Sequence, residues 1–531
     1  MSTPSGDQEI RVQLHSAMAM LGAGDGESAL ELMTRLVRAH PGRTDVLHRY
    51  GVVLARTGRD AEAAGVLQKV VALTPGSMNA ASDQANVLLK LGRNEEALEV
   101  LQTCLAATSG DSAARDAATF NFNLGRACKL GGFALEALAP LRQTLAWYPQ
   151  HYAALLVLGD VHKALGNEAD AASCYRQAMA VQQGDGTAWW SLSNLKSSAF
   201  TDGEFEQLQQ SAQDSNDTAQ NVFFEFALAT ELDQRDQIEL AFAHYRKGNQ
   251  LKRQLEPWDR EEFSRWLENI RGAMEHVEIA PRPAGWSGPR PVFLVSLPRS
   301  GSTLTEQILA AHSGVTAASE LPVVPRVLAD QSRRMQSSMV SWSAALDVRG
   351  WQRLGAEYLD LCRPWYRDTA VFTDKLPGNI SHVGAILAML PDALVIHVRR
   401  DAMDVCWSCY RQLFIGGAGF ANDFQDLAAY WQDQQRHMAY WQHRLPDRVL
   451  SVDYELLVTK PERETGKLLE FLDLPFEAAC LEPHAAARAV HTPSSLQVRQ
   501  KIHAKGIGHW RRYATHLEEL AAAFSNPKAT S

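Results

Sequence analysis

The feature that most constrains this chain is a spacing of small residues that recurs along its first third. Gly51 is followed by Gly58, Ala63 and Pro75, at offsets of 7, 12 and 24 residues. The same spacing, with or without the proline, starts again at residues 17, 85, 125 and 159. Three of the four steps between successive starts are 34 residues long, and the fourth is 40. Repetition at this period predicts a stack of similar units rather than one globular core.

Each unit has the residues that a helical hairpin needs. A small residue lets two helices approach closely, a glycine forms the turn between them, and a proline closes the unit. The period and these positions resemble tetratricopeptide repeats. That resemblance implies an α-helical solenoid whose concave surface holds a protein or peptide partner, here an acceptor. A solenoid that only spaces the domains or forms a homodimer is the alternative.

Bulk properties exclude several classes of protein. The 531 residues are too many for one hydrophobic core, so at least two domains are expected. The net charge of −9 argues against a nucleic-acid partner. The chain start lacks a signal-peptide pattern, and no apolar run reaches the roughly 18 residues of a membrane span. The 7 cysteines predict neither a disulfide framework nor a zinc site. We therefore expect a cytoplasmic protein without a membrane span or a metal.

The pattern of apolar residues changes after a cluster of prolines and glycines at residues 281–291. Short apolar runs at 291–296, 394–398 and 449–452 are separated by helical stretches. Continuous apolar strands of this kind predict a parallel sheet covered on both faces. We expect helical repeats over residues 1–200, a helical extension and linker over 201–288, and an α/β domain over 289–531. The α/β domain should bind its ligand beyond the carboxyl ends of its strands.

A loop with the character of an anion site follows the first predicted strand. It contains Ser300, Gly301, Ser302 and Thr303, and a helix is expected from Thr305 to His312. Backbone N–H groups and the positive end of a helix dipole would point at a phosphate there, and the hydroxyls would add donors. An ordinary capped helix start is the alternative. The lysine of an ATP-type loop is absent, and Arg299 stands earlier in the loop instead.

The string Pro-Arg-Ser-Gly-Ser-Thr-Leu at 298–304 resembles the 5′-phosphosulfate loop of the sulfotransferases, which is P-loop-like. The family also holds a 3′-phosphate with an arginine at a strand end and a serine eight residues later. Arg400 and Ser408 have this spacing here. A bidentate arginine and a hydroxyl suit a phosphate. The resemblance implies 3′-phosphoadenosine 5′-phosphosulfate (PAPS) as the sulfuryl donor, bound by residues 299–303, Arg400 and Ser408.

The segments at 314–322, 372–377 and 452–457 resemble those of the protein-tyrosine sulfotransferase branch. The segments at 494–499 and 508–513 resemble the flap of bacterial members joined to tetratricopeptide repeats. The resemblance implies that Glu320 is the general base, and that Arg299 and Lys375 stabilise charge on the bridging oxygen. It also implies that Tyr454 contacts the nucleotide. Ser494, Arg499 and the later residues 508–513 would belong to a C-terminal flap over the donor.

The acceptor stays open at this point. Glu320 and the repeats favour a tyrosine of a peptide or protein, and the Lys-Thr-His stretch of small-molecule sulfotransferases does not occur in the chain. A carbohydrate or small-molecule hydroxyl is the alternative within this class. The alternative from another class is a repeat scaffold joined to a P-loop NTPase or kinase, which would need a lysine in the loop and Mg²⁺.

Overall fold

A computed structural model describes residues 6–107, 114–195, 200–280, 289–365, 369–485 and 500–525. The chain divides into two compact units, Met1–Leu165 and Gly166–Ser531. Ser494 and Arg499 lie outside the described residues, so their predicted place in a flap remains a prediction.

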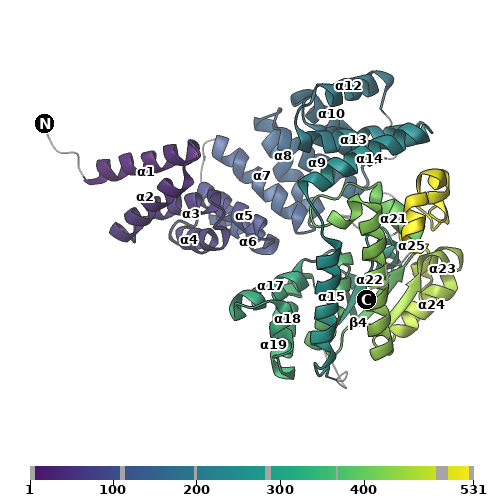
Figure 1. Cartoon of the computed structure of the whole chain (residues 1–531). Helices are drawn as coiled ribbons and strands as arrows, with labels where there is room; N and C mark the ends of the chain where they lie inside the picture. Colours follow the sequence, from purple (N-terminus) through teal and green to yellow (C-terminus); the bar gives the residue numbers. More distant parts are fainter. Residues whose placement is uncertain are drawn as a thin grey trace. The chain divides into compact units, whose positions relative to one another are not determined.

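The first unit consists of helices that pair in sequence order (Figure 1). Their bounds are α1 Gly6–Gly22, α2 Gly26–Ala39, α3 Thr44–Arg56, α4 Asp60–Leu73, α5 Met78–Lys90, α6 Asn94–Ala107, α7 Ala114–Leu130, α8 Ala134–Trp147 and α9 Tyr152–Leu165. The turn glycines that the repeat predicted all have a left-handed backbone, with φ between 69° and 86°. This conformation favours glycine, and it explains why glycine recurs at that place in each hairpin.

Small residues mark the points where the two helices of a hairpin touch. A Cβ atom on Gly51 would come within 2.7 Å of Leu67, and one on Gly125 within 2.5 Å of Leu141. The alanine of each second helix is fully buried, as at Ala63. The spacing that repeats in the sequence therefore records close helix contacts, and the predicted stack of helical hairpins is confirmed.

The second unit begins with further helices. Their bounds are α10 Glu168–Val181, α11 Gly186–Ser193, α12 Asp202–Asp214, α13 Thr218–Gln234, α14 Ile238–Leu255 and α15 Arg260–Glu275. The helices α13 and α14 form a long hairpin. Phe226 of α13 packs edge-on against Tyr245 of α14, with ring centroids 6.0 Å apart.

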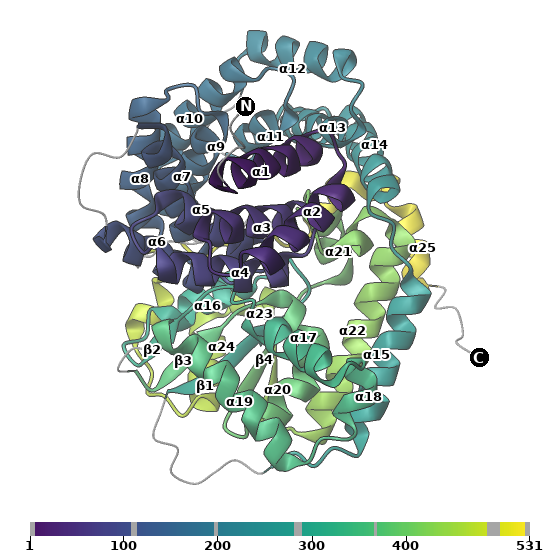
Figure 2. The ribbon, with the colours of Figure 1, turned by 90° about the vertical axis from the view of Figure 1, so that its left-hand side faces the viewer.

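A five-stranded parallel sheet follows, in the order β2-β3-β1-β4-β5 (Figure 2). The strands are β1 Arg290–Val295, β2 Val315–Ala317, β3 Val371–Asp374, β4 Leu394–Arg399 and β5 Val449–Asp453. The chain runs from β1 to one side of the sheet and later returns to the other side. The strand order thus reverses at β1, and a ligand site is expected beyond the carboxyl ends of β1 and its neighbours.

Helices connect the strands, and further helices follow the last strand. Their bounds are α16 Ser302–Ala310, α17 Val323–Met335, α18 Met339–Ser343, α19 Val348–Cys362, α20 Val383–Met389, α21 Ala402–Tyr410, α22 Phe424–Arg444, α23 Tyr454–Thr459, α24 Pro461–Phe471 and α25 Glu518–Ser525. Short 3₁₀ segments are η1 Arg363–Trp365, η2 Pro377–His382, η3 Gly419–Asn422, η4 Ala478–Leu481, η5 Pro483–Ala485 and η6 His509–His516.

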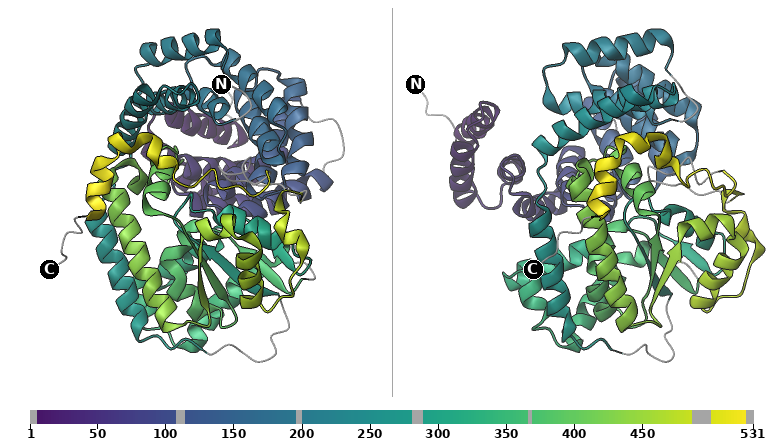
Figure 3. Two further views of the ribbon diagram at one scale, coloured as in Figure 1. Left: turned by 90° about the vertical axis from the view of Figure 1, so that its right-hand side faces the viewer. Right: turned by 45° about the vertical axis from the view of Figure 1, so that its right-hand side comes forward.

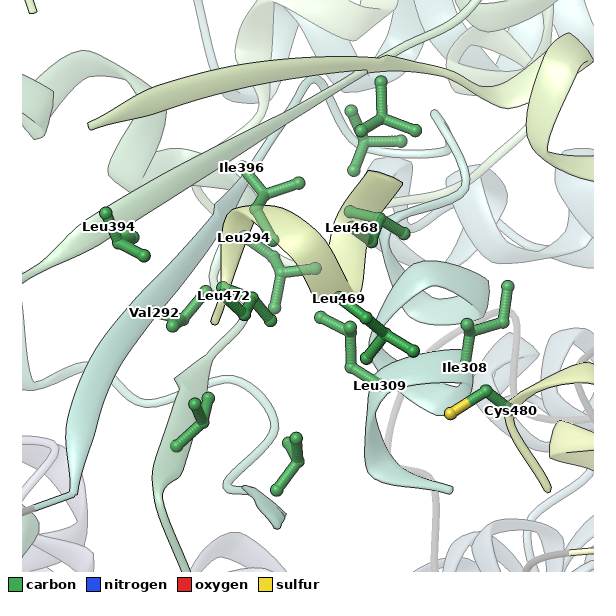
Figure 4. Close-up of a cluster of buried hydrophobic side chains, with 14 of the residues drawn as sticks. Val292, Leu294, Ile308, Leu309, Leu394, Ile396, Leu468, Leu469, Leu472 and Cys480 are labelled. Carbon is green, nitrogen blue, oxygen red and sulfur yellow. The ribbon is translucent and has the colours of Figure 1, made fainter. Parts of the chain in front are cut away.

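The core beside the sheet fixes the first strand and its helix. Leu294 of β1 and Ile396 of β4 pack with Ile308 of α16 and Leu469 of α24, all at most 1% exposed (Figure 4). Burying side chains of this size contributes about 1.5–3 kcal/mol each. The loop between β1 and α16 is therefore held at both ends by packed elements.

Candidate active site

The loop after β1 turns sharply into α16. Gly301 caps the helix with φ 99°, and the helix begins at Ser302 rather than at the predicted Thr305. Ser302 and Thr303 thus lie in the first helical turn, where backbone N–H groups have no partner within the helix. Ser300, Ser302 and Thr303 are all buried, at 2%, 4% and 7% exposure. The strand, the loop and the helix start follow one another as the sequence predicted, and anion binding at this place stays a prediction.

Tyr454 and Arg400 pack over this loop. A Cβ atom on Gly301 would come within 2.4 Å of the Tyr454 ring, so only glycine lets the ring approach so closely. The guanidinium of Arg400 lies over the same ring, with its Cζ atom 4.9 Å from the ring centre. Burial raises the pKa of the Tyr454 hydroxyl, and the charge of Arg400 opposes that shift. The tyrosine that begins α23 therefore joins the loop after β1 to the arginine after β4.

Arg299 lies at the centre of the same group. Its Nε donates to the Ser408 hydroxyl at 3.2 Å, and its carbonyl accepts from Arg400 at 2.8 Å. Its backbone is left-handed, with φ 67°, which is uncommon for a residue other than glycine. Burial lowers the pKa of the Arg299 guanidinium to about 10, with Arg400 among the charges that add to the shift. We call Arg299, Arg400, Ser408 and Tyr454 the arginine cluster.

A cavity of about 620 Å³ opens on the arginine cluster. All four cluster residues line it, together with Lys505. The Nε of Arg400 is buried and has no hydrogen-bond partner within the described part of the chain. A buried guanidinium that keeps an unused donor is suited to an anion, because a phosphate oxygen can accept that hydrogen bond. The residues present therefore fit a phosphate-bearing ligand.

A second group lies at the ends of β2 and β3. Glu320 forms an ion pair with Lys375, whose side chain is fully buried while that of Glu320 is 37% exposed. Backbone hydrogen bonds hold the two segments together, because the Lys375 N–H donates to the Ser319 carbonyl at 2.9 Å. The sheet thus brings together the predicted base and the predicted lysine, 55 residues apart in the chain.

Two buried acids support this pair. Glu306 of α16 accepts from the backbone N–H of Ser319 at 3.0 Å and from the Thr373 hydroxyl at 3.3 Å. Asp374 accepts from the Tyr358 hydroxyl at 2.9 Å. Burial raises the pKa of Asp374 to about 8, and the nearby charge of Glu306 adds to the shift. We call Glu306, Glu320, Asp374 and Lys375 the carboxylate cluster.

The sequence did not single out the acids at 306 and 374, which lie next to predicted motifs. An acidic residue at the end of a buried strand, such as Asp374 at the end of β3, is the available signal, since a buried carboxyl needs a partner.

A C-terminal segment completes the wall of the cavity. The Gly506 carbonyl accepts from Arg400, and Gln500, His503 and Lys505 line the cavity. The turn that follows is anchored on α21, where Asp404 accepts from the backbone N–H of Gly508 at 2.6 Å. Residues 508–513 were expected near the nucleotide as part of a flap, but the anchoring role of Asp404 was not predicted.

Helices that precede the sheet also contribute to the cavity. Asn194 follows α11, and Thr230, Asp233 and Gln234 belong to α13. Sequence reasoning placed this region outside the site. No local motif marks these residues, and only the fold brings them to the arginine cluster.

Comparisons with known proteins agree with this architecture. Residues 291–478 match the Sulfotransferase family. Residues 16–77, 82–132 and 152–185 match tetratricopeptide repeats. The chain therefore carries tetratricopeptide repeats followed by a domain of the sulfotransferase family, built on a parallel sheet. The predicted fold class is confirmed.

Several known proteins are similar to part of this chain. An uncharacterized protein of Aquifex aeolicus (strain VF5) is 32% identical over 399 residues, which are 72% of this chain and 51% of that protein. The protein-tyrosine sulfotransferase of Drosophila melanogaster is 26% identical over 242 residues, covering 41% of this chain and 46% of that protein. The chain thus spans about half the length of these two relatives. The sulfotransferase domain of the Synechococcus PCC 7002 olefin synthase aligns at 22% identity with a TM-score of 0.32, over 46% of this chain and 98% of that domain.

The described ranges contain neither a candidate membrane-spanning helix nor a candidate metal-binding group. Within them, no helix is long and apolar enough to cross a membrane. Nor do the histidine, cysteine and acidic side chains of these ranges form a group of three or more that could hold a metal ion.

Proposed function

We propose that this protein transfers a sulfuryl group from PAPS to an acceptor hydroxyl, and that the acceptor is a tyrosine of a peptide or protein. The observation that carries the proposal is that two unlike groups follow the carboxyl ends of strands in one parallel sheet. The arginine cluster follows β1 and β4, and the carboxylate cluster follows β2 and β3. Phosphate-binding cations and a candidate base therefore flank the reversal of strand order.

The arginine cluster would hold the donor. The first turn of α16 and the hydroxyls of Ser302 and Thr303 suit the 5′-phosphosulfate, because a helix start attracts an anion. The guanidinium of Arg400 and the hydroxyl of Ser408 suit the 3′-phosphate. Tyr454 presents a ring beside Leu304 and Ile502 in a small adjoining pocket, and the flat base could stack on such a ring.

The carboxylate cluster would carry the transfer. The acceptor oxygen attacks the sulfur and forms a new S–O bond, while the bond from sulfur to the bridging oxygen of the phosphosulfate breaks. Glu320 takes the acceptor proton, and 3′-phosphoadenosine 5′-phosphate (PAP) leaves with the electron pair of the broken bond. Lys375, buried beside Glu320, and Arg299 would stabilise the charge that grows on the bridging oxygen.

Three features support the proposed acceptor and the proposed base. The relatives from Drosophila melanogaster and Danio rerio, at 26% and 27% identity, are named protein-tyrosine sulfotransferases. The tetratricopeptide repeats of the first unit offer a surface on which a polypeptide acceptor could bind. Glu320 is more exposed than its partner Lys375, as a base that meets an incoming hydroxyl must be.

The experiment is a transfer assay on the full chain. The protein is incubated with PAPS and a panel of tyrosine peptides, phenols and oligosaccharides, and products are detected by mass spectrometry as the increment of one sulfate. Sulfated tyrosine peptides are the expected result. Products on oligosaccharides or phenols alone would change the acceptor class. ATP hydrolysis without any sulfated product would overturn the proposal.

A further inference from the structure

Residues 500–513 contribute one wall of the cavity, and helices outside the sheet hold this segment in place. The Gly506 carbonyl accepts from Arg400, so this segment contacts the arginine cluster directly. The segment continues into η6, which packs against α14 and α21 (Figure 3). A residue that fixes this segment would therefore control the shape of the proposed donor site without touching the reacting atoms.

Asp233 has the contacts for such a role. It lies in the last turn of α13, lines the cavity and is 14% exposed. Its Oδ2 pairs with Arg411 after α21 at 2.8 Å. Its Oδ1 accepts from the Tyr513 hydroxyl at 2.8 Å and pairs with Arg512 at 3.2 Å. One carboxylate thus joins three parts of the chain, namely α13, the end of α21 and η6.

We propose that Asp233 is a positioning residue for donor binding, through which the helices that precede the sheet hold the C-terminal segment and Arg411 at the arginine cluster. The inference rests on the proposed function, since it concerns the same donor site. It extends that site to a helix that precedes the residues matched by the sulfotransferase family, 291–478.

The charges explain why a carboxylate is needed here. Arg411 and Arg512 both point at Asp233, and without it two guanidinium groups would face each other across the cavity wall. The Tyr513 hydroxyl would lose its acceptor in a residue that is fully buried against Trp407, with ring centroids 4.4 Å apart. A buried donor left without a partner is costly, so η6 would move away. Both oxygens of Asp233 are engaged by these groups, which leaves it a role in positioning rather than in catalysis.

The test compares Asp233→Asn with a matched control three residues away. Asp236 also pairs with Arg512, at 2.7 Å, but it is 83% exposed. Its φ of 60° suits asparagine, so Asp236→Asn should fold normally. PAP affinity is measured by calorimetry, and hydrogen exchange is measured over residues 500–513 in the absence of ligand. We expect Asp233→Asn to weaken PAP binding about tenfold or more, the scale of a lost charged hydrogen bond. We also expect faster exchange in this segment and a donor KM that rises more than kcat falls.

The outcomes separate this inference from the proposed function. Unchanged PAP affinity and unchanged exchange in Asp233→Asn would overturn the inference. Failure of the unaltered protein to bind PAP would overturn the proposed donor, while the exchange measurement would still test the anchoring. If Asp233→Asn does not fold, Tyr513→Phe removes one of the three contacts and keeps the ring against Trp407. Its exchange and PAP affinity should then change in the same direction, by a smaller factor.

Discussion

The arginine cluster and the carboxylate cluster both follow the carboxyl ends of strands in one parallel sheet, but they are held in different ways. In the arginine cluster, side chains bind to backbone as well as to each other: Arg400 donates to the carbonyls of residues 299 and 506. The carboxylate cluster contains one ion pair, between Glu320 and Lys375, and the buried acid Glu306 binds the backbone of the neighbouring Ser319. The first group is a framework with several supports, whereas the second depends on a single exposed carboxylate.

This difference predicts two kinds of failure. Loss of Arg400, Ser408 or Tyr454 from the arginine cluster should weaken binding and leave the chemistry intact, because the remaining donors still contact the anion. Arg299 is the exception, since it is also proposed to stabilise charge on the bridging oxygen. Loss of Glu320 should stop the chemistry and leave binding intact, because the other two acids of the carboxylate cluster, Glu306 and Asp374, are buried and cannot meet an acceptor. The variants below test that division, beginning with the largest effect.

Glu320→Gln should reduce turnover by about 10²–10⁴-fold, the usual contribution of a positioned general base. The amide keeps the shape of the side chain but cannot take the acceptor proton. PAP affinity, measured by calorimetry, should stay close to that of the unaltered protein. Glu357→Gln is the matched control, because Glu357 is also ion-paired, with Arg334 at 2.7 Å, but belongs to α19 and not to the cluster. A parallel loss of PAP affinity in Glu320→Gln would mean that the two clusters are not separable.

Arg400→Ala should weaken PAP binding by about 10–100-fold, because a buried charged group that pairs with a phosphate contributes a few kcal/mol. Turnover at saturating donor should change much less. Arg399→Ala is the control from the neighbouring position: Arg399 pairs with Asp453 at 2.8 Å, and both side chains are about 40% exposed. Equal effects of the two substitutions would show that net charge, and not the geometry of Arg400, holds the donor.

The helical repeats and most residues of the two clusters could be predicted from the sequence. The repeat period predicted the helical hairpins, since turn glycines and small contact residues carry strong local constraints. The loop at 298–304 and the pair Arg400 and Ser408 could be placed because a strand end, a spacing and a helix start fix where such side chains lie. Glu320 and Lys375 needed the family resemblance, and only the strand order β2-β3-β1 explains why they meet.

The supports of the site could not be predicted in the same way. Glu306 looks like an ordinary helical glutamate until Ser319 and Thr373 are brought against it by the sheet. Asp233 lies 66 residues before Arg299, in a helix with no motif. Contacts of this kind arise from packing between distant elements, for which a local pattern carries no signal.

Asp374 gives the smallest effect, and it concerns stability rather than binding. Burial raises its pKa to about 8 from an ordinary value of 3.8, so the folded protein keeps a proton that the unfolded chain releases. The contribution of Asp374 to stability is therefore fully present below pH of about 4 and is lost as the pH rises toward 8. Asparagine mimics the neutral acid and still accepts from Tyr358. The melting temperature of Asp374→Asn, relative to the unaltered protein, should rise by a few degrees between pH 5 and 8.

Melting curves at several pH values check this, and the difference between the two proteins cancels the other titrating groups. Parallel profiles would show that Asp374 is not held neutral. PAP affinity is the control, and it should be the same in both proteins at each pH, because Asp374 belongs to the carboxylate cluster. A pH-dependent change in PAP affinity would instead show that the two clusters communicate through β3 and β1, which pair along Phe293 and Asp374.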